Sequence, residues 1–527
     1  MSFAADPPLA VPDELTRFLL RPESYPDSTS RIELIETHIS RVFLTDQFVY
    51  KVKKPVRFEF LDFSMLAARK QACDDEVRLN RRMAPTVYLG VLPIARGADG
   101  RLCWEGPGEP IEWVVKMRRL DASRMLDRLI REERLTGDDV ARLADHLANY
   151  YASAPALRVN ADDYHRSIVR HVRANRDDLL ASCPEDLHDS VRRIHAEQLE
   201  ELFCNREMYD DRVAEGKIIE GHGDLRPEHI CLETPPVVYD CVEFSADFRR
   251  VDIADELCFL QMECELLGHA EVGRAVLDAY RRCAGDDVPD ELQEFYKSYR
   301  ACVRGKVAAL RARQQPGELQ AASQAELRKY LRFAGGHNIP IDRTGWTLFV
   351  MRGLMGTGKS TLAAALALET ASERFRTDDV RRELFGDSPQ DASFGGGKYG
   401  PEQKRLVYEE VLRRCERRLC DGESVIADGM FLDDESLRRA AEVAATTGAH
   451  LVVVECRCSA EVAKRRISVR LGTTTDSSEA RPDMYDIQAA SVCAVPATLR
   501  CISIDTELPV EEQLALFWDG LQRPMKT

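Results

Sequence analysis

The sequence contains no apolar run that approaches the roughly 20 residues needed to span a bilayer. Its first residues, MSFAADPPLAVPDEL, lack the basic and apolar regions of a secretion signal. No CxxC pair occurs among the 16 cysteines, and their scattered spacing predicts reduced thiols rather than disulfides or zinc sites. These absences lead us to expect a cytoplasmic protein that does not act at a membrane.

The sequence also lacks a surplus of positive charge. It has 89 acidic residues against 73 lysines and arginines, and its formal net charge is −16. This balance argues against bulk binding to nucleic acid, which requires a basic surface. The apolar fraction of 44% is ordinary for a folded protein, and 527 residues exceed what one core supports. We therefore expect two or three domains and no nucleic-acid partner.

Three stretches of the chain differ in their secondary-structure pattern. Residues 30–120 are rich in short β-prone runs, followed by the helical pattern SMLAARKQACDDEVRLNRRMA. Residues 121–335 read mainly as helix, apart from the strand and loop island GHGDLRPEHICLETPPVVYDCVEF. From residue 346 onward, apolar strands alternate with helices, which predicts a parallel sheet with helices on both faces.

This change of secondary-structure pattern along the chain predicts two domains. Gly, Pro, Asn and Asp gather in AGGHNIPIDRTG, so we place a linker at residues 336–345. The fold class expected for residues 1–335 is α+β, and residues 346–527 are expected to form an α/β domain.

The segment GLMGTGKS, from Gly353 to Ser360, fits the pattern GxxxxGK[ST] of a phosphate-binding loop. The strand TLFVMRG precedes it and the helix TLAAALALET follows, so backbone N–H groups and the helix N-terminus would face the phosphates. Lys359 would reach the β and γ phosphates, and the Ser360 hydroxyl would ligate Mg²⁺. The expected nucleotide-binding residues are Gly353, Leu354, Met355, Gly356, Thr357, Gly358, Lys359, Ser360 and Thr361.

Two acids follow the phosphate loop at positions suited to catalysis. In RTDDVRREL, Asp378 would orient the acceptor hydroxyl or take its proton, and Arg381 would share its helix face. The alternative is that Asp378 simply caps a helix. In SVIADGM, Asp428 ends a buried strand and would contact the metal or the substrate, or else be a turn residue.

Two arginines could close over the phosphates. Arg466 and Arg470 in EVAKRRISVR are four residues apart and share one helix face. They would stabilise charge on the transferred group, or they would only line a solvated basic face. The glycine-rich stretch at 395–400 lacks a strand–loop–helix context and is expected to be a mobile loop near the substrate pocket.

With these motifs in place, residues 346–520 resemble the small-molecule and polynucleotide-end kinases of the P-loop class, which include gluconate kinase-like and zeta-toxin-like proteins. In that group the acid of a D-x-x-R motif faces the acceptor hydroxyl, which matches Asp378 and Arg381. An R-x-x-x-R helix forms a lid, which matches Arg466 and Arg470.

The island GHGDLRPEHI resembles the catalytic loop H-G-D-x-x-x-x-N of aminoglycoside phosphotransferase-like kinases. The resemblance makes Asp224 the residue that positions and deprotonates the acceptor hydroxyl, with His222 packing the loop. The metal-binding Asn of that family is His229 here, and histidine is a softer ligand than Mg²⁺ prefers. Asp240 in VVYDCVEF matches the second metal-binding acid, with Glu243 nearby. A structural acid of the family corresponds to Asp252 or Asp255 in ADFRRVDIADEL.

Upstream, FVYKVKKP would supply the lysine that holds the ATP phosphates. Lys51 and Lys53 point to the same strand face, and we favour Lys51. Its partner on the following helix would be Glu76, and IEWVVKM, near Met117, resembles the hinge strand that holds adenine.

The chain therefore resembles a bacterial two-domain protein, with an aminoglycoside phosphotransferase-like domain fused to a P-loop kinase-like domain. Our first hypothesis is a bifunctional enzyme that uses ATP and Mg²⁺ at two sites to phosphorylate small-molecule hydroxyls. A second makes the N-terminal domain a catalytically weak nucleotide sensor that regulates the other, with His229 in its favour. A P-loop motor or nucleic-acid ATPase is disfavoured by the acidic charge and by the lack of helicase motifs.

Overall fold

The chain divides into two compact units. One consists of residues 1–166 and 208–337, and the other of residues 167–207 and 338–527. The structure is a computed structural model that describes residues 13–58, 61–97, 99–106, 108–336, 346–386, 400–471, 482–490 and 492–522. The predicted linker, apart from Gly336, and the glycine-rich stretch at 395–400, apart from Gly400, lie outside these ranges.

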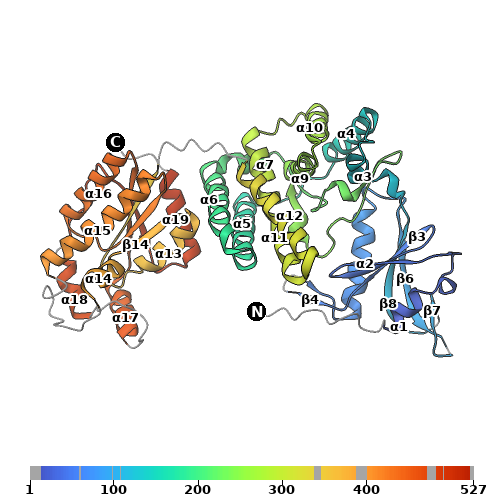
Figure 1. Ribbon diagram of the computed structural model, residues 1–527, viewed down its shortest axis with the longest axis horizontal. Helices are drawn as coiled ribbons and strands as arrows, with labels where there is room; N and C mark the ends of the chain where they lie inside the picture. The colour runs from blue at the N-terminus through green and yellow to red at the C-terminus, as the bar shows by residue number, and fades with distance from the viewer. Residues whose placement is uncertain are drawn as a thin grey trace. The chain divides into compact units, whose positions relative to one another are not determined.

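The first unit begins with an antiparallel sheet in the order β1-β2-β3-β8-β6-β7 (Figure 1). Helix α2 (Leu66–Asn80) packs against β6 and β8 through an apolar cluster that includes Cys73, Val77 and Val115. The short helix α1 (Glu14–Leu19) contributes Leu19 to a second cluster. The strands are β1 (Glu33–Glu36), β2 (Ser40–Leu44), β3 (Phe48–Lys53), β6 (Tyr88–Arg96), β7 (Leu102–Trp104) and β8 (Pro110–Arg118), with the separate hairpin β4 (Arg57–Phe58) and β5 (Leu61–Asp62).

The rest of this unit is mainly helical, so an α+β arrangement is observed. Short strand pairs interrupt the helices: β9 (Ile218–Glu220) with β12 (Arg250–Asp252), and β10 (Ile230–Cys231) with β11 (Val237–Val238). The helices are α3 (Leu126–Arg131), α4 (Gly137–Ala152), α7 (Arg206–Ala214), α8 (Ala246–Arg249), α9 (Ile253–Leu266), α10 (Ala270–Ala284), α11 (Asp290–Gln314) and α12 (Gly317–Gly336).

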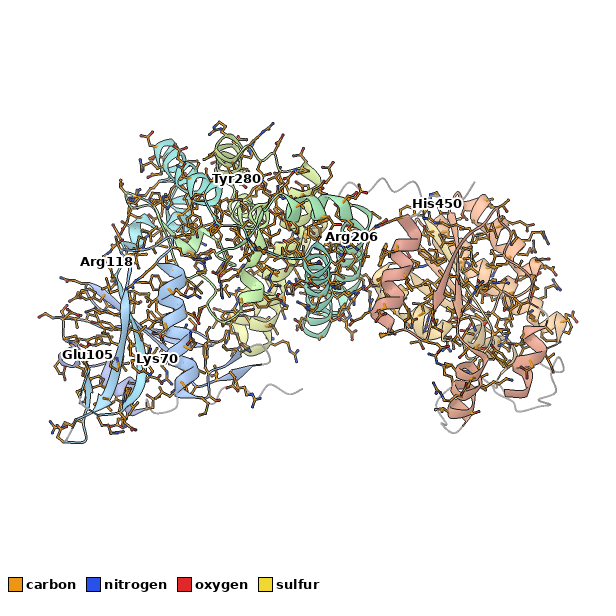
Figure 2. The ribbon with its side chains drawn as sticks, turned by 180° about the vertical axis from the view of Figure 1, so that it is seen from behind. Lys70, Glu105, Arg118, Arg206, Tyr280 and His450 are labelled. Atoms are coloured by element: carbon orange, nitrogen blue, oxygen red, sulfur yellow. The ribbon has the colours of Figure 1, made fainter. Side chains whose placement is uncertain are left out.

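Buried polar pairs fix several of these helices. Tyr280 of α10, labelled in Figure 2, donates its hydroxyl to Asp286 at 2.9 Å. Asp286 also accepts from Arg212 of α7 at 2.6 Å, so one carboxylate joins two helices.

The second unit contains a parallel sheet in the order β14-β15-β13-β16-β17. Leu348 and Val350 of β13 pack into a core with α15 and α16, whereas Phe349 between them meets Phe517 of α19. Because side chains alternate along a strand, helices cover both faces, and the predicted architecture is confirmed. The strands are β13 (Thr347–Arg352), β14 (Glu373–Arg376), β15 (Val425–Asp428), β16 (His450–Arg457) and β17 (Arg500–Asp505). The helices are α13 (Lys359–Glu369), α14 (Thr377–Phe385), α15 (Pro401–Cys420), α16 (Asp434–Thr447), α17 (Ala460–Leu471), α18 (Pro482–Ala489) and α19 (Val510–Gln522).

A helix pair from the middle of the chain also belongs to this unit. It comprises α5 (Ala161–Ser182), from residue 167 onward, and α6 (His188–Cys204). Helix α6 contacts both α13 and α19. The sequence alone predicts this segment to be part of the N-terminal domain, residues 1–335.

Across the residues that the structure describes, no helix is long and apolar enough to cross a membrane.

Candidate active site

The phosphate loop lies between β13 and α13, as the sequence predicts. Gly353, Gly356 and Gly358 all have positive φ, at 144°, 76° and 81°. A Cβ atom on Gly356 would lie 2.5 Å from the carbonyl oxygen of Ala463, and one on Gly353 would lie 2.6 Å from that of Cys456. Glycine is therefore required both by the backbone conformation and by the close approach of neighbouring elements.

Hydrogen bonds within the loop hold its curvature. Lys359 donates through Nζ to the carbonyl oxygen of Leu354 at 2.6 Å, and the Thr357 hydroxyl donates to the same oxygen at 2.8 Å. Lys359 is the first residue of α13, so its amine lies near the positive end of the helix dipole. This arrangement forms a basic, backbone-lined cradle for an anion. Leu354 and Met355 pack against Ala463, Ile467 and Tyr485.

Asp428 ends β15 and is 3% exposed. Burial raises the pKa of Asp428, while the Lys359 and Arg374 charges and a hydrogen bond from Ser360 lower it. Its Oδ2 atom has no hydrogen-bond partner among the described residues, and the nearest cations, Arg376 and Arg374, lie 3.8 and 3.9 Å away. A buried carboxylate oxygen beside a hydroxyl is a ligand pair that suits Mg²⁺.

Asp378 lies in the first turn of α14, at the same edge of the sheet. Arg381 donates through Nη1 to its Oδ1 at 2.7 Å, so the predicted pair forms. The helix-cap alternative is not observed, because the N-cap of α14 is Arg376, with no side-chain cap bond. The Thr377 hydroxyl donates to the carbonyl oxygen of Asp428 at 3.3 Å, which ties α14 to the end of β15.

Arg466 adjoins the phosphate loop. Its Nη2 donates to the carbonyl oxygen of Thr506 at 2.7 Å, and the Thr506 hydroxyl donates to that of Thr357 at 2.7 Å. A Cβ atom on Gly358 would lie 3.3 Å from Nη1 of Arg466. Arg470 lies in α17, but its side chain is outside the described residues.

In the first unit, buried charges hold the GHGD loop. Glu256 accepts hydrogen bonds from the backbone N–H groups of His222 and Gly223, both at 2.7 Å. Arg300 forms a two-pronged pair with Asp255, at 2.6 Å for each contact, and also donates to the Gly223 carbonyl at 3.2 Å. Asp252 instead caps α9 and pairs with Arg212, so both acids left open by the sequence are structural.

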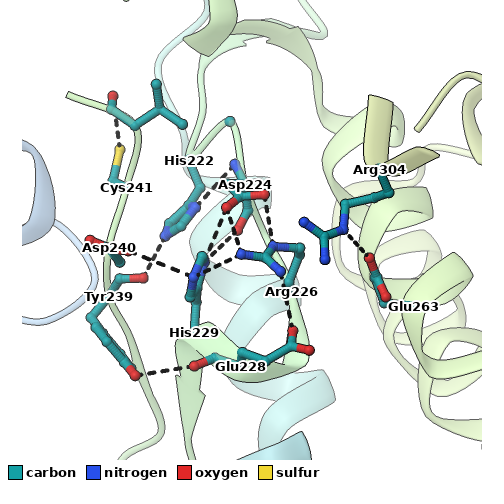
Figure 3. A network of polar contacts seen from close by, with 12 residues as sticks. His222, Asp224, Arg226, Glu228, His229, Tyr239, Asp240, Cys241, Glu263 and Arg304 are labelled. Atoms are coloured by element: carbon teal, nitrogen blue, oxygen red, sulfur yellow. Dashed lines mark hydrogen bonds and ion pairs between the residues drawn. The ribbon is translucent and has the colours of Figure 1, made fainter. Parts of the chain in front are cut away.

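Asp224 is held by its own loop (Figure 3). Arg226 donates to both of its carboxylate oxygens, at 2.8 and 3.0 Å. The His229 ring lies between two acids, with Nδ1 3.6 Å from Asp224 and Nε2 3.7 Å from Asp240. Burial raises the pKa of Asp224, but Arg226 and His229 outweigh it and lower the pKa to about 2.

Both lysines of β3 contact Glu76, which is fully buried. Lys51 lies 2.8 Å from Glu76 and 2.7 Å from Asp240. Lys53 is completely buried between Glu76 and Glu243. Burial raises the pKa of Asp240, but Lys51 and His229 lower it well below its usual range. Asp240 also has a φ of 64°, a strained conformation of the kind found at functional sites.

The structure thus brings Lys51, Glu76, Asp224, His229 and Asp240 into one cluster. Met117 of β8 lies in the apolar cluster with Val115 and Cys73. Other members of the two sites are not among the residues predicted from the sequence: Arg226, Glu256 and Arg300 in the first unit, and Arg374, Arg376 and Thr506 in the second. Glu256 and Arg376, like Arg226, lie inside the sequence motifs described above, and Arg374 lies two residues before one of them. Arg300 and Thr506 come from distant elements, and no local signal marks them.

Among the described residues, no group of three or more His, Cys, Asp or Glu side chains is arranged to hold a metal ion. Any metal at either site would therefore need ligands from a bound nucleotide or from water as well.

These features define a P-loop nucleotide-binding domain, joined to an α+β unit that carries a second charged cluster. A family model described as an AAA domain matches residues 348–492. Two mycobacterial relatives are each 32% identical over 455 residues, covering 85% of this chain and 88% of theirs. They are the uncharacterized proteins Rv2004c of Mycobacterium tuberculosis and Mb2027c of Mycobacterium bovis. The chain belongs to the family of these two proteins.

Solved structures give weaker likenesses. A sugar kinase from Janibacter sp. HTCC2649 is 23% identical and matches 34% of this chain and 96% of its own, with a TM-score of 0.27. A choline kinase from Cryptosporidium parvum Iowa II is 9% identical and matches 57% of this chain and 88% of its own, with a TM-score of 0.37. Scores this low do not establish a common fold, so the assignment of the second unit rests on its geometry and on the family model.

Proposed function

We propose that the chain is an ATP-dependent phosphotransferase that moves the γ-phosphoryl group of ATP to hydroxyl groups of small molecules. The observation that carries this proposal is the constellation at the phosphate loop. Lys359, Ser360 and the buried, incompletely paired Asp428 meet at the start of one helix and the end of one strand. The paired Asp378 and Arg381 lie at the same edge.

In the P-loop unit, Ser360 and Asp428 would hold Mg²⁺, which would neutralise phosphate charge when bound. Lys359 and the loop N–H groups would bind the β and γ phosphates. Asp378 would orient the acceptor hydroxyl, and Arg466, with Arg470 further along α17, would stabilise charge on the transferred group.

In the first unit, a second site of kinase-like type is our further proposal. Lys51, held by Glu76, would bind phosphate, since Lys53 is completely buried and used by Glu243. Asp224 would orient the acceptor, and His229 would hold the metal ion together with Asp240, whose carboxylate also pairs with Lys51. Met117 would mark the strand that holds adenine.

Labelled ATP and a fractionated metabolite extract test the proposal. Wild type, Lys359→Ala and Asp224→Ala are compared for labelled products, and each variant is expected to lose a different product by at least about 100-fold. Loss of all products in Lys359→Ala, with no change in Asp224→Ala, would restrict catalysis to the phosphate loop. Unchanged products in both variants would refute a phosphotransferase at either site.

One observation favours a second candidate, a nucleotide sensor in the first unit. Its acids are already paired with cations: Asp224 with Arg226, and Asp240 with Lys51. If the first unit is a sensor, the Lys359→Ala variant should still bind MgATP in that unit but should show no turnover. Turnover that disappears with Asp224→Ala would exclude it.

A further inference from the structure

Helix α13 begins at the phosphate loop, and its last residue has a buried carboxylate. Glu369 is the last residue of α13, and its side chain is 2% exposed. Arg173 donates to it through Nε at 3.0 Å and through Nη2 at 2.7 Å. Arg176 donates through Nη1 at 3.2 Å, and Trp518 donates through Nε1 at 3.3 Å. This end of α13 is therefore tied to α5 and α19.

The neighbouring helix α6 contributes an aromatic contact. Phe203 stacks on Trp518 with ring centroids 5.2 Å apart and planes 6° apart. Trp518 meets Phe517 at 5.4 Å, and Phe517 meets Phe349 at 5.6 Å. Phe349 lies in β13, the strand that leads into the phosphate loop. The helix pair α5–α6 is thus linked to both elements that flank the loop.

We propose that residues 167–207 support the nucleotide site, and that Arg173 and Arg176 are positioning residues for it. They hold α13, and with it Lys359 and Ser360, in the position that binds phosphate. This inference rests on the proposed binding of nucleotide at the phosphate loop.

The physical basis is the high cost of burying a carboxylate. A buried charge is stable only where opposite charge and hydrogen bonds surround it, so Glu369 stays buried only while α13 keeps its place against α5. The forked guanidinium of Arg173 fixes orientation as well as distance, which a lysine does not. Small displacements of binding groups lower function steeply, so loosening one end of this short helix should weaken phosphate binding at the other.

Calorimetry with MgATP on the full-length protein tests the inference. The parent carries Lys51→Ala and Asp240→Ala, so that binding reports only the phosphate loop. The paired substitution Arg173→Ala and Arg176→Ala is expected to raise Kd at least tenfold, at a temperature where circular dichroism shows a folded protein. If that variant does not fold, Arg176→Lys and Glu369→Gln replace it, with an expected rise of at least threefold.

Two controls separate positioning from general stability. Arg192→Ala removes an exposed α6 arginine, 40% exposed and paired with Asp189, and should leave Kd within twofold. Ala440→Gly weakens α16 and should lower the melting temperature without changing Kd.

The outcomes are distinct. Unchanged Kd in the folded arginine variants would overturn the inference, as would an equal rise in Ala440→Gly. Undiminished binding in Lys359→Ala would instead refute the proposed nucleotide site itself.

Discussion

At the scale of single residues, the two sites hold their acids in opposite ways. Burial raises the pKa of Asp428, and its Oδ2 is left without a hydrogen bond within the described part of the chain. Asp224 is surrounded by cations, which lower its pKa to about 2 despite burial. Asp428 therefore has an oxygen atom available to an added cation, whereas the charge of Asp224 is already balanced by residues of its own loop.

The pairing of Asp224 predicts a pH-dependent stability. Its pKa falls from 3.8 to about 2 in the folded state, so its ion pair stabilises the fold fully above pH 3.8. That contribution is lost as the pH falls from 3.8 towards 2. Arg226→Met should therefore lower stability by about 1–2 kcal/mol at neutral pH, and the difference from wild type should shrink below pH 3.8.

Thermal melts between pH 2.5 and 7 measure this difference. Arg128→Ala, which removes an exposed pair with Glu132, is the control and should change stability by no more than about 0.5 kcal/mol. A difference for Arg226→Met that stays constant across the whole range would show that Asp224 does not depend on this pair.

At the scale of elements, each site depends on the junction of a strand, a loop and a helix. The phosphate loop fits between α13 and α17 because Gly356 leaves room for the backbone of α17. The GHGD loop is held from behind by Glu256 and Arg300, which lie on the helices α9 and α11. In both units, buried side chains on helices fix the loop that would meet the ligand.

Gly356→Ala tests the fit of the phosphate loop. Its Cβ would lie 2.5 Å from the Ala463 carbonyl at a φ of 76°, so the loop must shift, and MgATP should bind at least about 100-fold more weakly. Gly448→Ala is a matched control, because its φ is 70° but no atom lies within 4 Å of the added Cβ.

The Gly448→Ala control should lower the free energy of unfolding by about 1 kcal/mol through backbone strain alone, and it should leave MgATP binding unchanged. Calorimetry and thermal melts of the two variants give both quantities. Equal loss of binding in the two would mean that positive φ, rather than the contact with α17, accounts for the effect.

At the scale of the whole molecule, the compact units do not follow the chain in simple order. Residues 167–207 precede much of the first unit in sequence but belong to the second. The pairs that join this segment to α13 lie 193–196 residues apart in the chain.

This division predicts the result of cutting the chain. With a protease site inserted between residues 337 and 345, the cleaved protein should elute as one species in native size-exclusion chromatography. One fragment carries Arg173, Arg176 and Phe203, and the other carries Glu369 and Trp518, so the second unit still holds them together. Strong denaturant should separate the fragments.

Arg173→Ala combined with Phe203→Ala should let the cleaved fragments separate without denaturant, because both the ion pair and the stacked rings are lost. Fragments that separate at once in the wild-type background would contradict the assignment of residues 167–207 to the second unit.

The sequence by itself determined the local elements. The glycine loop, its flanking strand and helix, and the parallel α/β pattern follow from spacing and periodicity, which depend on neighbours a few residues apart. The pairing of Asp378 with Arg381 likewise follows from a spacing of three on one helix.

Only the tertiary structure decided which distant charges meet. That Lys51 and Lys53 share Glu76 depends on the packing of α2 against the sheet. That Arg173 meets Glu369 depends on the packing of α5 against α13, which brings together residues 196 positions apart in the chain. Buried ion pairs form wherever the fold removes charges from water together, and local sequence carries no record of a partner that arrives from another element.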